Sequence, residues 1–161
     1  MGAIEERLTE LGLTLPAVFA GPPGMAVRFD LVRVAGDVAY VSGHGPMDGP
    51  QVLISGKVGD HRAGWLSQEV GYEAARLTAL SMLASLKAEF GDLDRVSAWL
   101  KVLGFVNVAA GFTGTPPVMN GFSELILELW GEAGRHARSA IGVAELPFDL
   151  PVEAEAVVAL S

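Results

Sequence analysis

Two stretches of the chain place apolar residues at the three- and four-residue spacing that buries one side of a helix. In the first stretch, the apolar positions are Val70, Ala74, Leu77, Leu80, Leu83 and Ala84. In the second stretch, they are Val118, Phe122, Leu125, Ile126 and Leu129. This spacing predicts two long amphipathic helices, each with one face available for a core.

Residues that favour helix ends flank both stretches. Ser67 is a suitable N-cap for the first helix, and Gly91 is a suitable end because glycine readily adopts the left-handed conformation there. Thr115 is followed by two prolines and is the expected cap of the second helix. Gly131 and Gly134 are expected to close that second helix.

Alternating or continuous apolar runs elsewhere predict strands. Their ranges are 27–34, 38–41, 51–54, 95–105, 137–143 and 152–160. The stretches 45–50 and 56–65 carry turn residues without a regular period, so we expect loops there. Near the N-terminus, Ile4, Leu8 and Leu11 have helical spacing before Gly12. We expect this short helix to pack on the domain surface, with a subunit contact as the alternative.

The predicted order is β-β-β-α-β-α-β-β, in one domain over residues 1–161 whose residues 1–24 form an N-terminal helical extension and linker. That order suits an α+β two-layer sandwich in which both long helices cover one face of a mixed sheet. The terminal strands carry small and apolar residues on both sides, so the uncovered face would be a large apolar patch on a monomer. Closed cyclic symmetry usually buries such a face, and we therefore expect a homo-oligomer.

Composition restricts the possible partners. Half of the 161 residues are hydrophobic, and 19 acidic against 11 basic side chains give a net charge of −8. An acidic chain repels nucleic-acid phosphates. Cysteine is absent, which excludes disulfides and thiol catalysis. The acidic N-terminus does not resemble a signal peptide, and no apolar run approaches the ~20 residues of a membrane span. We therefore expect a cytoplasmic protein with no nucleic-acid or membrane partner.

The last two predicted strands carry the charged residues that most suggest chemistry. Period-two alternation places Arg138 on the same strand face as Ala140, and places Glu153 and Glu155 together on one face of the next strand. A guanidinium among small residues can hold a carboxylate through two hydrogen bonds. A nearby glutamate can orient or deprotonate a water. A structural ion pair between Arg138 and one of the glutamates is the alternative, and the pattern leaves it open.

Three further positions attract attention because of their residue types. Ser42, Gly43 and His44 end a predicted strand, where Gly43 has no side chain to keep a ligand from the backbone. His44 can titrate near neutral pH, although a structural hydrogen bond is the simpler role. His136 is expected at a strand edge and His61 in a loop. The spacing of these histidines fits no metal site, so no metal is expected.

Several of these residues lie in segments that resemble one protein family. The runs RSAIGVAELP (138–147) and VEAEA (152–156) resemble the closing motif of the RidA family, also called YjgF or endoribonuclease L-PSP. The runs VSGH (41–44), DRV (94–96) and KVLGFVN (101–107) extend the resemblance over most of the chain. The resemblance implies a chorismate-mutase-like fold and a homotrimer with clefts between subunits. It also implies hydrolysis of small 2-imino or 2-enamino acids to 2-oxo acids and ammonia, without a cofactor.

The resemblance implies roles for individual residues as well. Arg138 would hold the substrate carboxylate, and Glu155 would place or activate the attacking water, with Glu153 as the alternative. Asn120 matches a family asparagine near the cleft, Phe29 stands where active deaminases have tyrosine, and His44 stands where the family has glutamine. The expected substrate-binding residues are Phe29, Ser42, Gly43, His44, Asn120 and Ala140.

Two other functions stay open. The same fold could bind a small carboxylate, such as a 2-oxo acid, without turning it over. Phe29, which lacks the tyrosine hydroxyl, and the N-terminal extension favour that interpretation. A ribonuclease, the activity in one of the family's names, is less favoured because the chain is acidic.

Overall fold

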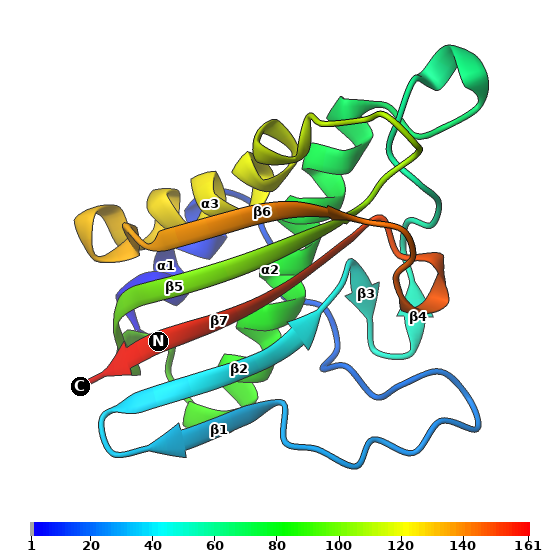
Figure 1. Cartoon of the computed structure of the whole chain (residues 1–161). Coiled ribbons are helices and arrows are strands. Elements are labelled where there is room, and N and C mark those ends of the chain that lie inside the picture. The colour runs from blue at the N-terminus through cyan, green and yellow to red at the C-terminus, as the bar shows by residue number, and fades with distance from the viewer. Residues whose placement is uncertain (1) are drawn as a thin grey trace.

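The computed structural model describes residues 2–161, which form a five-stranded mixed sheet with two long helices on one face (Figure 1). The strand order across the sheet is β1-β2-β7-β5-β6. These strands are β1 (Val32–Ala35), β2 (Val38–His44), β5 (Val96–Asn107), β6 (Ala137–Val143) and β7 (Val152–Leu160). The helices are α1 (Ala3–Glu10), α2 (Gln68–Phe90) and α3 (Thr115–Trp130). The short 3₁₀ turns are η1 (His61–Ala63), η2 (Leu93–Arg95), η3 (Gly131–Gly134) and η4 (Pro147–Asp149).

The pairing of the strands determines where the sheet needs a helical crossover. β6 pairs in parallel with β5, and the other neighbours in the sheet are antiparallel. Parallel neighbours need a crossover connection, which α3 supplies between β5 and β6. Figure 1 shows α2 and α3 on the same side of the sheet. The expected α+β two-layer sandwich is therefore confirmed.

The core lies between the sheet and the two long helices. On β7, Val152 and Val158 are fully buried under the helices, whereas Glu155 is exposed on the other side, as the alternation predicts. The two helices approach each other closely, because a Cβ atom at Gly121 would lie 2.0 Å from the Tyr72 carbonyl oxygen. Only glycine allows this contact at position 121.

The predicted ends of α2 are confirmed, but the predicted cap of α3 is wrong. The Ser67 hydroxyl accepts a hydrogen bond from a first-turn amide, and Gly91 closes α2 with a φ of 74°. At α3, Gly114 occupies the cap position, and Thr115 is already helical. The Thr115 hydroxyl instead donates to the carbonyl oxygen of Ala140 on β6 at 2.9 Å, because the start of the helix packs against that strand.

The first predicted strand is shorter than its apolar run, since β1 begins only at Val32. Its partner β2 carries a β-bulge at Ser42 and Gly43, which together oppose the single residue Glu155 of β7. The Ser42 amide still donates to the Leu31 carbonyl oxygen at 2.9 Å, and residues 27–31 before that pairing form no strand.

A separate hairpin was not predicted. The expected loop at 45–50 contains β3 (Met47–Asp48), and the strand expected at 51–54 is confined to β4 (Gln51–Val52). Gly49 has a φ of 56°, the left-handed conformation that this tight turn needs. Strands of this length are too short to show a period in the sequence.

The N-terminal helix packs on the domain as its spacing predicted. Ile4 and Leu8 of α1 are buried in the common core, near α3 and η2. The Glu5 carboxylate accepts hydrogen bonds from the Lys87 ammonium and the Leu93 amide, which fasten α1 to the rest of the chain. Within residues 2–161, no helix has the length and apolar character needed to span a membrane.

Candidate functional site

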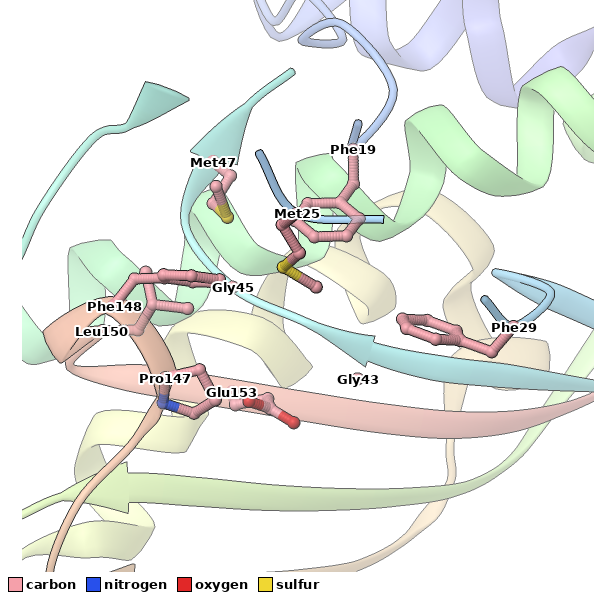
Figure 2. A pocket seen from close by; sticks show the side chains of 10 residues that line it. All are labelled: Phe19, Met25, Phe29, Gly43, Gly45, Met47, Pro147, Phe148, Leu150 and Glu153. Carbon is pink, nitrogen blue, oxygen red and sulfur yellow. The ribbon is translucent and has the colours of Figure 1, made fainter. Parts of the chain in front are cut away.

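Two groups of side chains with possible chemistry lie on opposite faces of the sheet. The first is the Arg138 cluster, which consists of Asn120, Ser123, His136 and Arg138 where β6 meets α3. The second is the Glu153 cavity, which opens on the face away from the helices (Figure 2). Its principal lining residues are Phe19, Met25, Phe29, Gly43, Phe148 and Glu153.

The Arg138 guanidinium is held by the first turns of α3. Its Nη1 donates to Asn120 Oδ1 and to Ser123 Oγ, each at 3.0 Å, and its Nη2 donates to the Pro116 carbonyl oxygen at 3.3 Å. The Nε hydrogen and the second Nη2 hydrogen have no acceptor within residues 2–161. Partial burial lowers the pKa of Arg138, but an arginine stays charged at neutral pH. The group therefore offers a fixed positive charge with donors to spare for a carboxylate.

His136 completes this network just before β6 begins. Its Nδ1 lies 2.7 Å from the Gly134 carbonyl oxygen, and its Nε2 lies 2.9 Å from Ser123 Oγ. A carbonyl only accepts, so Nδ1 carries the hydrogen and the Nε2 of the neutral ring accepts from the Ser123 hydroxyl. The lone pairs of Ser123 Oγ are then free to accept from Arg138. Burial, with a smaller contribution from the Arg138 charge, lowers the pKa of His136 and favours this neutral form.

The Glu153 cavity has a volume of about 240 Å³ and a mostly apolar lining, in which Glu153 is the only ionisable side chain among the described residues. The carboxylate lies directly over Gly43, where an added Cβ atom would come within 2.3 Å of Glu153 Oε1. Glycine at this position therefore makes room for the carboxylate. Burial, followed by the charge of Glu155, raises the pKa of Glu153. A partly buried carboxylate with a raised pKa at a cavity is suited to proton transfer.

The β2 bulge separates the roles of Ser42, Gly43 and His44. Gly43 lines the cavity, and the Ser42 hydroxyl donates to the Asp30 carbonyl oxygen at 2.7 Å. The His44 ring lies beneath the sheet, with Nε2 2.8 Å from Ser85 Oγ on α2. Burial lowers the pKa of His44. The His44 ring makes a structural hydrogen bond on the helix side of the sheet, which is the simpler of the two roles considered for it, and the ring does not line the cavity.

One wall of the cavity is formed by η4, whose backbone is strained. Phe148 and Asp149 have φ values of 57° and 56°, which residues with side chains rarely adopt. Asn107 is fully buried and holds this loop, since its Nδ2 donates to the Leu150 carbonyl oxygen at 3.1 Å. Lys57 Nζ in turn donates to Asn107 Oδ1 at 2.8 Å. The strained loop presents the Phe148 ring to the cavity (Figure 2).

Arg138 and the two glutamates point to opposite sides of the sheet. Arg138 is level with Val102 of β5, which is level with Ala156 of β7, and the last two are buried under the helices. Glu153 and Glu155 occupy the alternate positions of β7 and so point the other way. Within residues 2–161, Arg138 forms no ion pair with either glutamate, which removes the structural alternative. One chain alone therefore does not bring the arginine and a carboxylate to a common ligand.

The other predicted site residues divide between the two groups. The cavity contains Phe29 and Gly43, and the Arg138 cluster contains Asn120. Glu155 is exposed on the same sheet face as Glu153 but outside the cavity lining. Ala140 lies beside Arg138 on β6, where its carbonyl oxygen accepts the Thr115 hydroxyl.

Sequence reasoning missed several residues of both groups. Ser123 follows Asn120 by three positions on a predicted helix, and this spacing could have indicated that both face Arg138. Phe19, Met25 and Phe148 come from irregular segments, so no periodic signal could have placed them at the cavity.

One group of carboxylates has a geometry that could hold a cation. Oxygens of Glu5, Asp92 and Asp94 lie within 4.8 Å of one another. The Lys87 ammonium pairs with Glu5, and Asp94 accepts hydrogen bonds from two amides at the start of α1. These contacts account for the acidic residues as the fastening of α1, and we assign the group that structural role.

Comparisons with known proteins give consistent matches. The family model described as "YjgF/chorismate_mutase-like, putative endoribonuclease" matches residues 5–153. Protein TCP17 of Trypanosoma cruzi is 39% identical over 161 residues, which is 99% of this chain and 96% of that protein. The crystal structure of Atu1372 from Agrobacterium tumefaciens, described as a protein with unknown function, has a TM-score of 0.87 and 37% identity, covering 99% of this chain and 93% of that one.

A second similar solved structure, from Shewanella oneidensis MR-1, is described as "a putative endoribonuclease". It has a TM-score of 0.88 and 29% identity, covering 99% of this chain and 100% of that one. Because both structural matches cover nearly the whole chain, the likeness extends through the N-terminal segment that precedes the sheet.

Proposed function

The chain belongs to the YjgF family, the RidA family of the sequence resemblance, and on that basis we propose that it hydrolyses 2-imino acids, or their 2-enamino tautomers, to 2-oxo acids and ammonia. One observation carries the proposal. A fixed guanidinium with free donors lies at a sheet edge, and Glu153, which forms no ion pair within residues 2–161 and has a raised pKa, lies at a cavity on the open face. A substrate with a carboxylate next to an electrophilic carbon needs both groups.

The two groups meet between subunits in this proposal. β6 is an edge strand of the sheet, and the open face carries exposed apolar side chains such as Tyr40 and Ile141. Packing the β6 edge of one subunit against the open face of the next covers this apolar surface. It also brings Arg138 to the Glu153 cavity of the neighbour. The resemblance favours three-fold symmetry, so we propose a homotrimer with shared sites.

The proposed reaction needs only these groups and water. Arg138 holds the substrate carboxylate through its free Nε and Nη2 donors. Water adds to the protonated imine carbon and gives a proton to Glu153 of the neighbouring subunit. Glu153 returns that proton to the nitrogen. The C–N bond then breaks while the hydroxyl group gives its proton to Glu153 and becomes the carbonyl group, and this second proton leaves with ammonia as ammonium. A protonated imine is already electrophilic, so the proposal requires no cofactor.

The choice of Glu153 departs from the motif comparison, which favours Glu155. Glu153 lines the cavity and is partly buried, whereas Glu155 is exposed outside it. The pKa of Glu153 is raised, and a base of this kind is more effective near neutral pH than an ordinary carboxylate. We therefore assign proton transfer to Glu153, and assign Glu155 an electrostatic effect on it.

The test is ammonia release from 2-iminopropanoate generated in situ. Arg138→Ala is expected to lose roughly 100-fold in kcat/KM, because the substrate carboxylate is left without its charged partner. Arg62→Ala is the control, since Arg62 is exposed in η1 and lines neither the Glu153 cavity nor the hollow beside Arg138. A wild-type rate no faster than buffer, or an Arg138→Ala rate equal to wild type, would contradict the proposed function.

A second candidate function is a carboxylate-binding protein without turnover. The observation that favours it is Phe29, which gives the cavity a ring but no hydroxyl to hold water or substrate. Calorimetry with a panel of 2-oxo acids, beside the ammonia assay, distinguishes the two candidates. Binding that depends on Arg138 without ammonia release supports the binding protein. A ribonuclease stays third, because a net charge of −8 opposes RNA binding.

A further inference from the structure

The Glu153 cavity is larger than a small substrate side chain requires. Its volume is about 240 Å³, whereas an apolar protein cavity of about 150 Å³ already accommodates benzene. We propose that this cavity is a side-chain subsite for 2-imino acids with branched or aromatic apolar side chains. Examples are 2-imino-4-methylpentanoate and 2-imino-3-phenylpropanoate. This inference rests on the proposed function and adds a substrate class to it.

The walls of the cavity come from three separate parts of the chain. Phe19 and Met25 lie in the segment before the sheet, Met47 in the β3–β4 hairpin, and Phe148 and Leu150 at η4. Figure 2 shows these side chains gathered over the strands that carry Gly43 and Glu153. Aromatic rings and thioethers pack well against flat or irregular apolar groups. The lining therefore matches an apolar side chain in its chemistry as well as in its size.

The N-terminal wall is fastened in place. The Ala17 amide donates to Asp48 Oδ1 at 2.7 Å, and the Ala17 carbonyl oxygen accepts from the Gly49 amide at 3.0 Å. These two bonds attach the segment before Phe19 to the β3–β4 hairpin. Phe19 is consequently part of a built wall, and its removal is expected to change the subsite.

The position of Glu153 orients the ligand and excludes charged side chains. The carboxylate lies against Gly43 on the sheet floor, while apolar groups form the rest of the lining. The reacting carbon then lies beside Glu153, with its side chain among the apolar groups. An acidic side chain in the same place is repelled by Glu153 and left without a partner. A glutamate-derived 2-imino acid is therefore expected to be a poor substrate.

The experiment compares 2-imino acids produced in situ from alanine, leucine, phenylalanine and glutamate by an amino-acid oxidase. Ammonia release above the buffer rate gives kcat/KM for each. We expect the leucine- and phenylalanine-derived compounds to exceed 2-iminopropanoate by about tenfold or more, because each methylene bound in an apolar pocket favours the larger substrate. Equal or faster hydrolysis of 2-iminopropanoate overturns the inference but leaves the proposed function intact.

Two variants change the subsite in opposite directions. Phe19→Ala removes part of the wall and is expected to lower the preference for the phenylalanine-derived compound by roughly tenfold. Met25→Trp fills the cavity and is expected to slow the phenylalanine-derived compound much more than 2-iminopropanoate, so the ratio of the two rates is the readout. Val18→Ala is the matched control, since Val18 lies in the same segment but does not line the cavity. Equal effects of either variant on all compounds count against the subsite.

A binding measurement separates failure of this inference from failure of the proposed function. Calorimetry with pyruvate, 4-methyl-2-oxopentanoate and phenylpyruvate reports the subsite whether or not turnover occurs. If no 2-imino acid is hydrolysed but phenylpyruvate binds at least about tenfold more tightly than pyruvate, the reaction is wrong and the subsite stands. Equal affinities for the three oxo acids overturn the subsite.

Discussion

The Arg138 cluster and the Glu153 cavity are built from different parts of the fold. The cluster lies on regular elements, where β6 and α3 hold a polar network with bonds of about 3.0 Å. The cavity is formed mainly by irregular segments and contains one carboxylate among apolar side chains. In the proposed reaction the cluster binds the carboxylate that every substrate shares, and the cavity binds the side chain that varies. Regular elements suit a fixed contact, and loops suit a variable one.

The largest expected effect comes from removing Arg138 in one chain and Glu153 in another, and then combining the two variant chains in one oligomer. Arg138→Ala and Glu153→Gln chains should each be nearly inactive alone, because each lacks one half of every site. A shared site predicts that co-expressed chains recover activity, since the intact Arg138 of one chain meets the intact Glu153 of another. In a mixed trimer, one of the three sites combines both intact groups, so recovery to roughly a third of the wild-type rate is expected.

Two differently tagged chains allow mixed oligomers to be purified in tandem before their ammonia release is measured. Co-expression of each variant with itself is the control for tagging. Absence of recovery in verified mixed oligomers would show that the two groups do not form one site across subunits.

The sequence predicted the regular helices and strands well, including the strand that carries Arg138. The start of α2 at Ser67 and its end at Gly91 depend on contacts within one turn, so they are visible locally. Alternation placed Arg138 and Glu153 on definite strand faces. Alternation alone did not show that these two faces are opposite, because that depends on the register of β6, β5 and β7.

The walls of the Glu153 cavity could not be predicted from the sequence, because they depend on long-range contacts and not on contacts within one turn. Phe19 and Phe148 reach one cavity through long-range contacts, and neither segment has a period. The Thr115 hydroxyl bonds to β6 instead of capping its helix, which is a tertiary contact overriding a local preference. His44 turns beneath the sheet because a bulge precedes it, and a bulge leaves little trace in a short strand.

A smaller effect is expected from loosening the polar cluster alone. Ser123→Ala removes one acceptor of Arg138 and the hydroxyl that bonds to His136. A hydrogen bond to a charged group of this kind corresponds to a change of about tenfold, expected mainly in KM because it positions the carboxylate-binding group. Ser123→Thr should restore much of the affinity, since it keeps the hydroxyl. Ser97→Ala on β5 serves as an exposed control. A change in kcat without a change in KM would contradict the positioning role.

The smallest expected effect concerns the electrostatics of the cavity. The negative charge of Glu155 helps to raise the pKa of Glu153, so Glu155→Gln should lower that pKa. Glu153 acts as a base only when ionised, and kcat/KM therefore falls as the pH drops through its pKa. In Glu155→Gln this acidic limb is expected to move to lower pH, while the rate above the limb stays unchanged. Glu145→Gln is the control, because Glu145 pairs with Lys57 and does not line the cavity.

The same pH profile decides which glutamate transfers the proton. If Glu153 is the base, Glu153→Gln removes the acidic limb together with about 100-fold or more of the rate, and Glu155→Gln only moves the limb. If Glu155 is the base, as the motif comparison favours, Glu155→Gln is the variant that loses the rate. The partly buried position of Glu153 against Gly43 predicts the first outcome, because desolvation raises the pKa of this carboxyl group. If Glu155→Gln loses rate at every pH while Glu153→Gln stays active, then Glu155 on the exposed strand face is the catalytic base, and Glu153 in the cavity is not.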